Sequence, residues 1–258
     1  MLAYERKSRI IEYLEQNGRA EVNFLAEKLN VVTETIRRDL RELEHQGVLK
    51  RTHGGAIMQN QKEKEYPVQV RVMKNSMEKD KLCQKAAEYI SDGDLIFIDN
   101  STTLVNLIKY IDENIQMTVL TNSIKVLQEY AQYHKDNVTV ICTGGVFNKS
   151  NLSLSGTISD KSVREFFPNK AFLSCHGISA QYGLTDGNLL EVGFKLDMIR
   201  LAERVYFLID HTKFGKLGPI RLGNLDICDV LISDMSPDEE LMTQLKLANP
   251  EMEIAVIE

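Results

Sequence analysis

The chain lacks the features that would place it in a membrane or in an oxidising compartment. No stretch of its 258 residues approaches the roughly 18 consecutive apolar residues that a membrane-spanning helix needs. Charges begin at Glu5, Arg6 and Lys7, too early for the apolar segment of a signal peptide. No two cysteines form a C-x-x-C pair, which argues against a zinc site and a disulfide framework. We therefore expect a soluble cytoplasmic protein without a bound metal or cofactor.

Internal repeats, low-complexity tracts and a phosphate-binding loop of the G-x-x-x-x-G-K-[ST] type are also absent from the sequence. The last absence argues against an ATP- or GTP-dependent switch. What remains is the composition of an ordinary globular protein, with 43% hydrophobic and 26% charged residues. At about 100–200 residues per domain, the length fits one large domain or two ordinary ones.

The charge is distributed unevenly along the chain. Residues 1–57 carry ten Lys or Arg against nine Asp or Glu, a formal charge of +1, whereas the remainder carries 21 against 28, or −7. A relatively basic N-terminal segment in an acidic protein is a weak indication of a nucleic-acid partner. Whether this segment binds nucleic acid therefore depends on where its basic residues lie in the fold.

Three helical patterns fill the first 46 residues, each with apolar residues at the spacing of one helix face. The three apolar stripes are Ile10, Ile11 and Leu14; Val22, Leu25, Ala26 and Leu29; and Ile36, Leu40 and Leu43. Only about three residues separate the second pattern from the third, which is typical of a helix-turn-helix. Thr33 stands at the position of an N-cap for the third helix, and Gly47 supplies its stop.

A basic hairpin is predicted directly after these helices. A strand over 48–52 leads through His53-Gly54-Gly55 into a second short strand, so that the segment has the form of a wing. We therefore predict a winged helix-turn-helix domain over 1–57. Residues 58–75 are polar and contain Pro67, which predicts a loosely structured linker.

From residue 76 onward, helical patterns alternate with short apolar runs. A helix is expected over 102–110, and strands are expected over 95–98, 118–120, 138–141, 171–173, 205–209 and 230–232. The strands are almost continuously apolar, as in parallel strands that are covered on both faces. The predicted fold class is α/β: the winged helix-turn-helix followed by an α/β domain over 76–258 with a mainly parallel sheet.

The third helix carries the residues best suited to reading DNA. Its apolar stripe leaves the arginines on the opposite face, and arginine bonds guanine O6 and N7 bidentately and also pairs with phosphates. The candidate DNA-binding residues are Thr33, Thr35, Arg37, Arg38 and Arg41 on the helix, and Lys50, Arg51 and His53 on the wing. An exposed arginine pair is usually only solvated. The coincidence of a tight helix-turn-helix, a cationic helix face and a basic hairpin favours DNA.

This segment resembles the N-terminal signature of the DeoR/GlpR family of bacterial transcriptional regulators. The resemblance covers about residues 6–57 and is carried by TIRRDL at 35–40, Leu43-Glu44, Gly47, Leu49, Arg51 and HGGA at 53–56. One departure is Val32, where the family more often has a serine as helix cap. Residues 76–233 resemble the effector domain of the same family, which is similar in fold to ribose-5-phosphate isomerase. The resemblance implies double-stranded operator DNA and a phosphorylated sugar or polyol as partners.

Candidate effector-binding residues follow the predicted strands, because ligands of open parallel sheets sit beyond the carboxyl ends of the strands. They are Asp99, Asn100, Ser101, Thr102, Thr103, Asn122, Gly144, Gly145, His176, Glu191 and Lys213. Hydroxyls and free N–H groups over 99–103 converge at the expected start of a helix, whose dipole favours a phosphate. Such residues are also ordinary caps. The resemblance supports the phosphate, and it also gives Lys213 the role of its charge partner.

The competing function is a sugar-phosphate isomerase with a DNA-binding appendage. Asp99, Glu191 and Lys213 are chemically adequate for proton transfer next to a carbonyl. The isomerase's Gly-rich loop with an Arg-Glu-Lys sequence is missing, however, and the corresponding stretch is GLTDG at 183–187. We expect Cys175 and His176 to be neighbours on a strand and to face opposite sides, which places them poorly for a catalytic dyad.

We therefore predict a regulator without catalytic residues, most simply a repressor of carbohydrate catabolic genes. Helix-turn-helix modules usually act in symmetric pairs on DNA half-sites, which predicts a homo-oligomer, a dimer or a tetramer.

Overall fold

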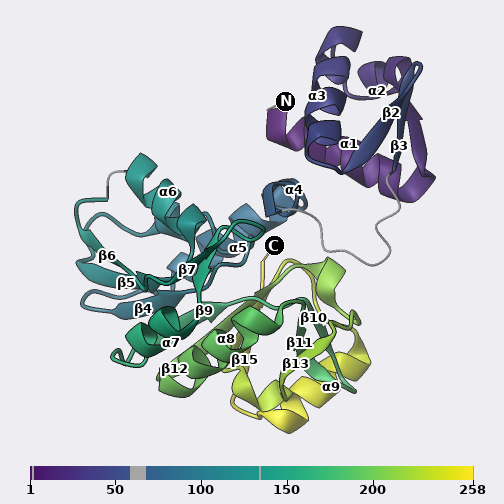
Figure 1. The fold of residues 1–258 in the computed structure, drawn as a ribbon. Coiled ribbons are helices and arrows are strands. Elements are labelled where there is room, and N and C mark those ends of the chain that lie inside the picture. The colour runs from purple at the N-terminus through teal and green to yellow at the C-terminus, as the bar shows by residue number, and fades with distance from the viewer. Residues whose placement is uncertain (2, 59–67, 134, 258) are drawn as a thin grey trace. The chain divides into compact units, whose positions relative to one another are not determined.

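The computed structural model describes residues 1, 3–58, 68–133 and 135–257. The chain divides into two compact units, Met1–Met77 (unit 1) and Glu78–Glu258 (unit 2), each with its own core (Figure 1). No helix in the described part of the chain is long and apolar enough to cross a membrane.

Unit 1 is a helix-turn-helix with a three-stranded wing. Its elements are α1 (Ala3–Asn17), β1 (Arg19–Glu21), α2 (Val22–Lys28), α3 (Thr33–His45), β2 (Leu49–Thr52), β3 (Gly55–Met58) and α4 (Val68–Met73). The predicted hairpin is confirmed as β2 and β3, which pair antiparallel. The strand β1 also pairs with β3, and at three residues it is too short to show a hydrophobic period. A Cβ on Gly55 would lie 2.1 Å from the Ala20 carbonyl oxygen, so this pairing requires glycine.

The core of unit 1 is built from the apolar stripes that the sequence shows. Ile10 and Ile11 of α1, Leu25 of α2, and Ile36 and Leu43 of α3 are all buried in one cluster. The prediction that Thr33 caps α3 is wrong. The N-cap is Val32, whose side chain makes no capping hydrogen bond, and Thr33 is the first helical residue.

The structure differs from the expected linker over 58–75. Residues 59–67 lie outside the described part of the chain, and residues 68–73 form the helix α4. Val70 of α4 is fully buried in the core of unit 1, and the Lys74 ammonium lies 2.5 Å from the Glu15 carboxylate of α1. Only Lys74 and Asn75 separate α4 from the next helix, and Asn75 has a left-handed backbone with φ of 51°. Residues 68–75 are therefore a packed helix and a tight turn.

Unit 2 is built on a seven-stranded parallel sheet. Its strands, in spatial order, are β15 (Glu253–Val256), β14 (Val230–Ser233), β12 (Arg204–Ile209), β9 (Lys170–Leu173), β4 (Leu95–Ile98), β5 (Met117–Thr121) and β6 (Val138–Cys142). Every neighbouring pair is parallel, as predicted, and all six expected strands are present. The edge strand β15 is additional.

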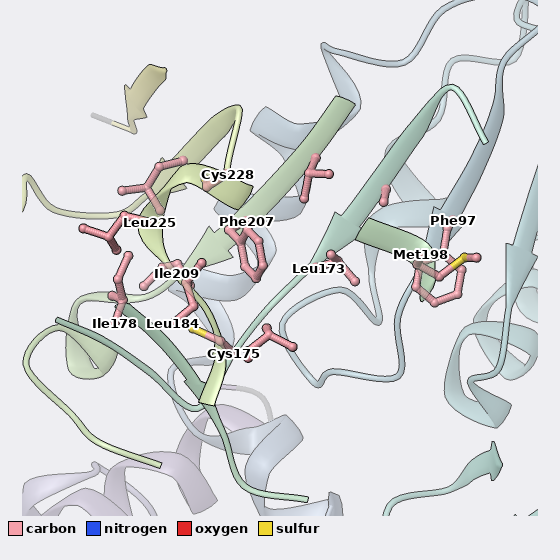
Figure 2. Close-up of a cluster of buried hydrophobic side chains, with 14 of the residues drawn as sticks. Phe97, Leu173, Cys175, Ile178, Leu184, Met198, Phe207, Ile209, Leu225 and Cys228 are labelled. Atoms are coloured by element: carbon pink, nitrogen blue, oxygen red, sulfur yellow. The ribbon is translucent and has the colours of Figure 1, made fainter. Parts of the chain in front are cut away.

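Side chains alternate between the two faces of this sheet and form two separate cores. Phe97, Leu173 and Phe207 point to one face and belong to one buried cluster, in which Met198 of α8 (Leu189–Leu201) lies beside Phe97 (Figure 2). Phe172 and Tyr206 point to the other face, where their rings stack with centroids 4.7 Å apart. The remaining helices are α5 (Ser76–Ala87), α6 (Ile124–Tyr133), α7 (Thr157–Val163) and α9 (Glu239–Ala248), with 3-10 turns η1 (Leu107–Tyr110), η2 (His211–Lys213) and η3 (Leu225–Ile227).

Short antiparallel elements complete unit 2. One small sheet contains β10 (Gly177–Ser179), β11 (Gly183–Asp186) and β13 (Ile220–Gly223), and a hairpin joins β7 (Val146–Asn148) to β8 (Ser153–Ser155). The predicted helix over 102–110 is wrong, because only the 3-10 turn η1 forms there. The backbone N–H groups of Leu104, Leu107 and Lys109 donate to carbonyls three residues back, as in turns and 3-10 helices.

Candidate functional site

The helix α3 presents its basic residues to solvent, as its apolar stripe requires. Arg37, Arg38 and Arg41 are exposed on α3, whereas Ile36 and Leu40 are buried. The wing residues Lys50, Arg51 and His53 are exposed as well, and Thr33 and Thr35 are half-buried. The structure thus leaves a cationic surface on α3 and the hairpin, at the positions that the sequence analysis selected for DNA.

Two arginines of this surface are paired with glutamates of unit 1. Arg37 lies 3.3 Å from Glu34, and Arg51 donates its Nε to Glu44 at 2.7 Å and its backbone N–H to the same carboxylate at 2.9 Å. Exposed ion pairs of this kind contribute only about 0–1 kcal/mol. Both guanidinium groups can therefore exchange their glutamate for a phosphate at little cost.

A buried ion pair holds α3 against α1, and the sequence analysis missed it. Arg6 Nε lies 2.5 Å from Asp39 Oδ2, and Arg6 Nη2 donates to Asp39 Oδ1 at 3.2 Å. Their hydrogen bond raises the pKa of the guanidinium, whereas burial opposes this rise. The signal was present: Asp39 stands three residues after Ile36, within the apolar stripe, where a carboxylate needs a buried partner.

In unit 2, polar residues follow successive strands of the parallel sheet and meet at its carboxyl edge. Asp99 follows β4, Asn122 follows β5, Thr143 follows β6, Ser174 follows β9 and Asp210 follows β12, and all of these residues are buried. Parallel strands present their carboxyl ends at one edge, so their following loops are gathered there. We call residues 99–103, 122, 174 and 213 the edge site.

Asp99 is the structural centre of the edge site. Its Oδ1 accepts the Ser101 N–H at 2.7 Å, and its Oδ2 accepts the Ser174 N–H at 3.1 Å. Lys195 of α8, which the sequence analysis did not select, lies 3.2 Å from the same Oδ2. Asp99 therefore joins two strand ends and a helix.

Lys195 is a buried charge held by two carboxylates. Its Nζ donates to Asp186 at 2.7 Å and to the Ser174 carbonyl at 2.8 Å. Burial lowers the pKa of this ammonium, but the charges of Asp186 and Asp99 raise it further, so the net direction is upward. The sequence showed Lys195 only as one more lysine on a helix, because the two carboxylates come from distant strands.

Lys213 of η2 reaches the residues to which the sequence analysis assigned the phosphate. Its Nζ donates to Ser174 Oγ at 2.7 Å and to Thr103 Oγ1 at 3.1 Å, and it lies 3.8 Å from the Asp210 carboxylate. The expected helix dipole at 99–103 is wrong, because no α-helix begins there. Lysine side chains supply the positive charge instead.

Two buried oxygens of the edge site lack a hydrogen-bond partner among the described residues. They are the Asn122 Oδ1 and the Ser101 Oγ. The Asn122 amide is oriented by its Nδ2, which donates to the Leu154 carbonyl of β8 at 3.2 Å. A buried polar atom without a partner costs about 1–3 kcal/mol, so these two oxygens are candidate contacts for a bound molecule.

The remaining predicted residues have structural contacts of their own. Glu191 is buried, and its Oε1 accepts Asn151 Nδ2 at 2.7 Å and Ser153 Oγ at 3.1 Å. His176 is half-buried after β9, where its backbone N–H donates to the Thr185 carbonyl. The part of both side chains in ligand binding stays a prediction.

The two glycines after β6 are needed for the backbone. Gly144 and Gly145 have φ of 69° and 114°, in the left-handed region that favours glycine. A Cβ on Gly145 would also lie 2.7 Å from the Ser155 carbonyl oxygen. The positive φ of both glycines and the close approach of Gly145 to β8 account for glycine at these positions. A role in ligand binding stays a prediction.

Two domains of known families match this chain. Residues 6–62 match the DeoR-like helix-turn-helix domain, and residues 74–235 match the DeoR C terminal sensor domain. The chain belongs to the DeoR family. It is thus a DNA-binding transcriptional regulator, with the cationic surface in the first domain and the edge site in the second.

Curated relatives of this DeoR-family regulator match over nearly their whole length. It is 34% identical to the L-fucose operon activator of Haemophilus influenzae, over 92% of this chain and 94% of that protein. It is 31% identical to the transcriptional repressor GlcR of Bacillus subtilis, over 93% and 91%. Among solved structures, ribose 5-phosphate isomerase A of Methanocaldococcus jannaschii is similar at 16% identity and a TM-score of 0.40, over 54% of this chain and 55% of that one. A likeness that weak carries no argument about activity.

Proposed function

We propose that this regulator binds a phosphorylated sugar or polyol at the edge site, and that binding changes its affinity for operator DNA. In this proposal it represses carbohydrate catabolic genes in the cytoplasm, and its effector releases it from the operator. The relatives include a protein named as a transcriptional repressor and one named as an L-fucose operon activator. The choice of a repressor is therefore part of the proposal.

The observation that carries the proposal is the position of Lys213. In the present structure its ammonium bonds two neutral hydroxyls, those of Thr103 and Ser174, whereas the Asp210 carboxylate is beyond hydrogen-bond distance at 3.8 Å. A phosphate would give the same ammonium a partner of opposite charge, which adds ion-pair attraction to the hydrogen bond. The hydroxyls can then donate to the remaining phosphate oxygens.

The unpartnered oxygens nearby fit the sugar part of such a ligand. Asn122 Oδ1 accepts only, so it needs a donor such as a sugar hydroxyl. Ser101 Oγ can donate to the phosphate or accept from a hydroxyl of the sugar. A polyhydroxylated phosphate ester supplies both kinds of partner, and a purely apolar ligand supplies neither.

We also infer that the edge site binds its ligand without converting it. The Glu191 carboxylate is bonded by Asn151 and Ser153, and burial raises the pKa of the Cys175 thiol to about 12, which keeps it protonated. Incubation with ribose 5-phosphate should therefore give no ribulose 5-phosphate. Formation of the ketose at an enzymatic rate would support the isomerase alternative.

The DNA-binding half of the proposal requires a symmetric assembly. A single helix-turn-helix covers one half-site, and two half-sites on one face of the duplex lie about 34–36 Å apart. We propose that the regulator is at least a dimer on its operator. Sedimentation with and without operator duplex measures this directly.

The test of the effector site is the substitution Lys213→Ala. Removal of a hydrogen bond to a charged group costs about 1.5–3 kcal/mol, so effector affinity should fall by about 10- to 150-fold. Operator affinity without effector should stay at the wild-type value, and the exposed Lys216→Ala, three residues further on, is the matched control.

The measurement is a titration of operator-bound protein, with the operator selected from a random duplex pool by the full-length chain. The ligands are ribose 5-phosphate, glucose 6-phosphate, fructose 1-phosphate and glycerol 3-phosphate, each beside its unphosphorylated parent. Equal responses to a phosphate and its parent, or an unchanged response in Lys213→Ala, would reject the phosphate site.

A further inference from the structure

The helix α5 packs directly against the phosphate-binding loop of the edge site. Lys79 Nζ donates to Thr102 Oγ1 at 3.2 Å, and Cys83 Sγ donates to the Thr103 carbonyl oxygen at 3.0 Å. Lys79 and Cys83 are one helical turn apart and therefore lie on the same face of α5. Neither residue was selected from the sequence.

Two lysines thus bracket two consecutive threonines. Lys79 bonds the Thr102 hydroxyl at 3.2 Å, and Lys213 bonds the Thr103 hydroxyl at 3.1 Å. Lys79 is only 7% exposed, which is unusual for lysine and places its ammonium inside unit 2 beside the loop. An anion bound over the two hydroxyls would meet an ammonium on each side.

Asp80, the residue after Lys79, ties the start of α5 to the turn that follows the loop. Its Oδ1 accepts Asn106 Nδ2 at 2.9 Å, and its Oδ2 accepts the Tyr110 hydroxyl. Two consecutive residues of α5, Lys79 and Asp80, therefore bond the segment 99–110 near its start and near its end.

The N-terminal turn of α5 is also where the two units of the chain are joined. The boundary falls between Met77 and Glu78, inside α5, and only Lys74 and Asn75 separate α5 from α4. The side chain of Val70 in α4 belongs to the buried core of unit 1. The path along the chain from Lys79 to Lys74 is five residues, so little slack is available to absorb a shift of α5.

We propose that Lys79 is a second phosphate-binding residue of the sensor. When the effector binds, Lys79 releases the Thr102 hydroxyl and bonds the effector phosphate instead, and this change is transmitted through α5 to the DNA-binding unit. This inference rests on the proposed function of the edge site. An ammonium binds a dianionic phosphate more strongly than a neutral hydroxyl, which gives the effector a different affinity for the two positions of Lys79. Such differential affinity is what shifts an equilibrium between conformations.

The two lysines then have separable effects. Lys213 lies in η2, far from α5 in the sequence, and contributes to effector affinity. Lys79 lies on the connecting helix and contributes to coupling, measured as the ratio of operator Kd with and without saturating effector. Coupling between two sites commonly amounts to a factor of about 5–150.

The experiment compares this ratio in full-length wild type, Lys79→Met, Lys79→Arg and the exposed control Lys81→Met, which lies two residues further along α5. The probe is whichever of ribose 5-phosphate, glucose 6-phosphate, fructose 1-phosphate and glycerol 3-phosphate gives the largest wild-type response, at saturation for each variant. We expect this ratio of operator Kd values to fall towards 1 in Lys79→Met and to stay at the wild-type value in Lys81→Met. In Lys79→Arg, the logarithm of the ratio should be at least half of the wild-type logarithm.

A second substitution keeps the inference testable if Lys79→Met fails to fold. Thr102→Val removes the hydroxyl that Lys79 bonds in the effector-free protein and leaves the lysine in place. Operator affinity without effector should then shift at least threefold towards its effector-bound value. A wild-type value in Thr102→Val would overturn the inference.

The outcomes separate this inference from the proposed function. If no probe changes wild-type operator affinity, both are wrong. If Lys213→Ala loses effector affinity but Lys79→Met keeps the wild-type ratio at saturation, the edge site stands and the role of Lys79 is overturned. If Lys79→Met only weakens effector binding, with an unchanged ratio, Lys79 is a ligand contact without a coupling role and the inference is again overturned.

Discussion

Replacement of Asp39 by alanine should destabilise unit 1 by about 3–5 kcal/mol, because it leaves the Arg6 guanidinium buried without its carboxylate. The side chains of Arg6 and Asp39 are 7% and 1% exposed, and two hydrogen bonds join them, at 2.5 and 3.2 Å. An isolated buried charge is among the most costly defects in a folded protein. The loss should therefore fall at the upper end of single-substitution effects.

A neighbouring pair between the same two helices provides the contrast. Lys7 of α1 pairs with Glu42 of α3, and the glutamate side chain is 47% exposed. Loss of an exposed pair costs about 1 kcal/mol or less. Glu42→Gln should therefore have a small effect where Asp39→Ala has a large one.

Hydrogen exchange of the full-length protein measures the difference within unit 1. A two-unit chain need not unfold in one step, so a global melting curve would mix the two units. Exchange at core amides of α1 and α3 reports the opening free energy locally. At about 1.4 kcal/mol per tenfold change, Asp39→Ala should accelerate this exchange by about 100- to 4,000-fold, and Glu42→Gln by about fivefold at most.

The double variant Arg6→Met/Asp39→Leu tests the reason for the loss. If the cost comes from an unpaired buried charge, replacing both partners by apolar side chains should restore most of the protection. Similar acceleration in Asp39→Ala and Glu42→Gln would refute the reasoning, as would a double variant no better than Asp39→Ala.

Two further predictions concern the DNA surface and pH. The double substitution Arg37→Ala/Arg38→Ala should weaken operator binding at least tenfold and reduce the slope of log K against log salt concentration by about 0.9 for each phosphate that is no longer neutralised. The exposed Arg200→Ala in unit 2 is the control and should change neither quantity. Wild-type operator binding by the double variant, measured by fluorescence anisotropy, would contradict the assignment of α3 as the DNA-reading helix. The bond to Asp234 raises the pKa of His211, although burial opposes it, so the stabilisation is fully present below about pH 6.5 and is lost as the pH rises through the raised folded-state value. Intrinsic amide exchange is base-catalysed and rises with pH in every protein, so the measured quantity is the protection factor around η2. Protection should fall over that range in wild type and stay constant in His211→Gln; the same pH dependence of protection in both proteins would count against this pair.

The helices of unit 1 could be read from the sequence because burial there follows a local period. Ile36, Leu40 and Leu43 fall on one face whatever surrounds the helix, and the arginines between them are then left outside. The parallel strands of unit 2 were predictable for a similar reason, since runs such as 205–209 are apolar on both faces. The resemblance to a family supplied the function, and the matching domains confirmed it.

The short elements could not be predicted in this way. The strand β1 and the hairpin of β7 and β8 have three residues per strand, too few to show a period, and exist because a partner strand pairs with them. The expected helix over 102–110 is replaced by turns, in which Leu104, Leu107 and Lys109 donate their N–H groups to carbonyls three residues back. In the same segment Cys83 of α5 bonds the Thr103 carbonyl oxygen. At such positions the local sequence pattern favours one secondary structure and the tertiary contacts favour another, and the tertiary contacts determine which one forms.

By itself, then, the sequence determined which faces of the helix-turn-helix are buried, the order of the six predicted parallel strands, and the polar residues that follow them. Only the tertiary structure decided which of those residues meet. Lys213 reaches Thr103 and Ser174 across 110 and 39 positions of the chain, and Lys195 joins Asp99 in the same region. No local pattern distinguishes these lysines from surface lysines, because their charge acquires its partners only when distant strand ends are brought to one edge of the sheet.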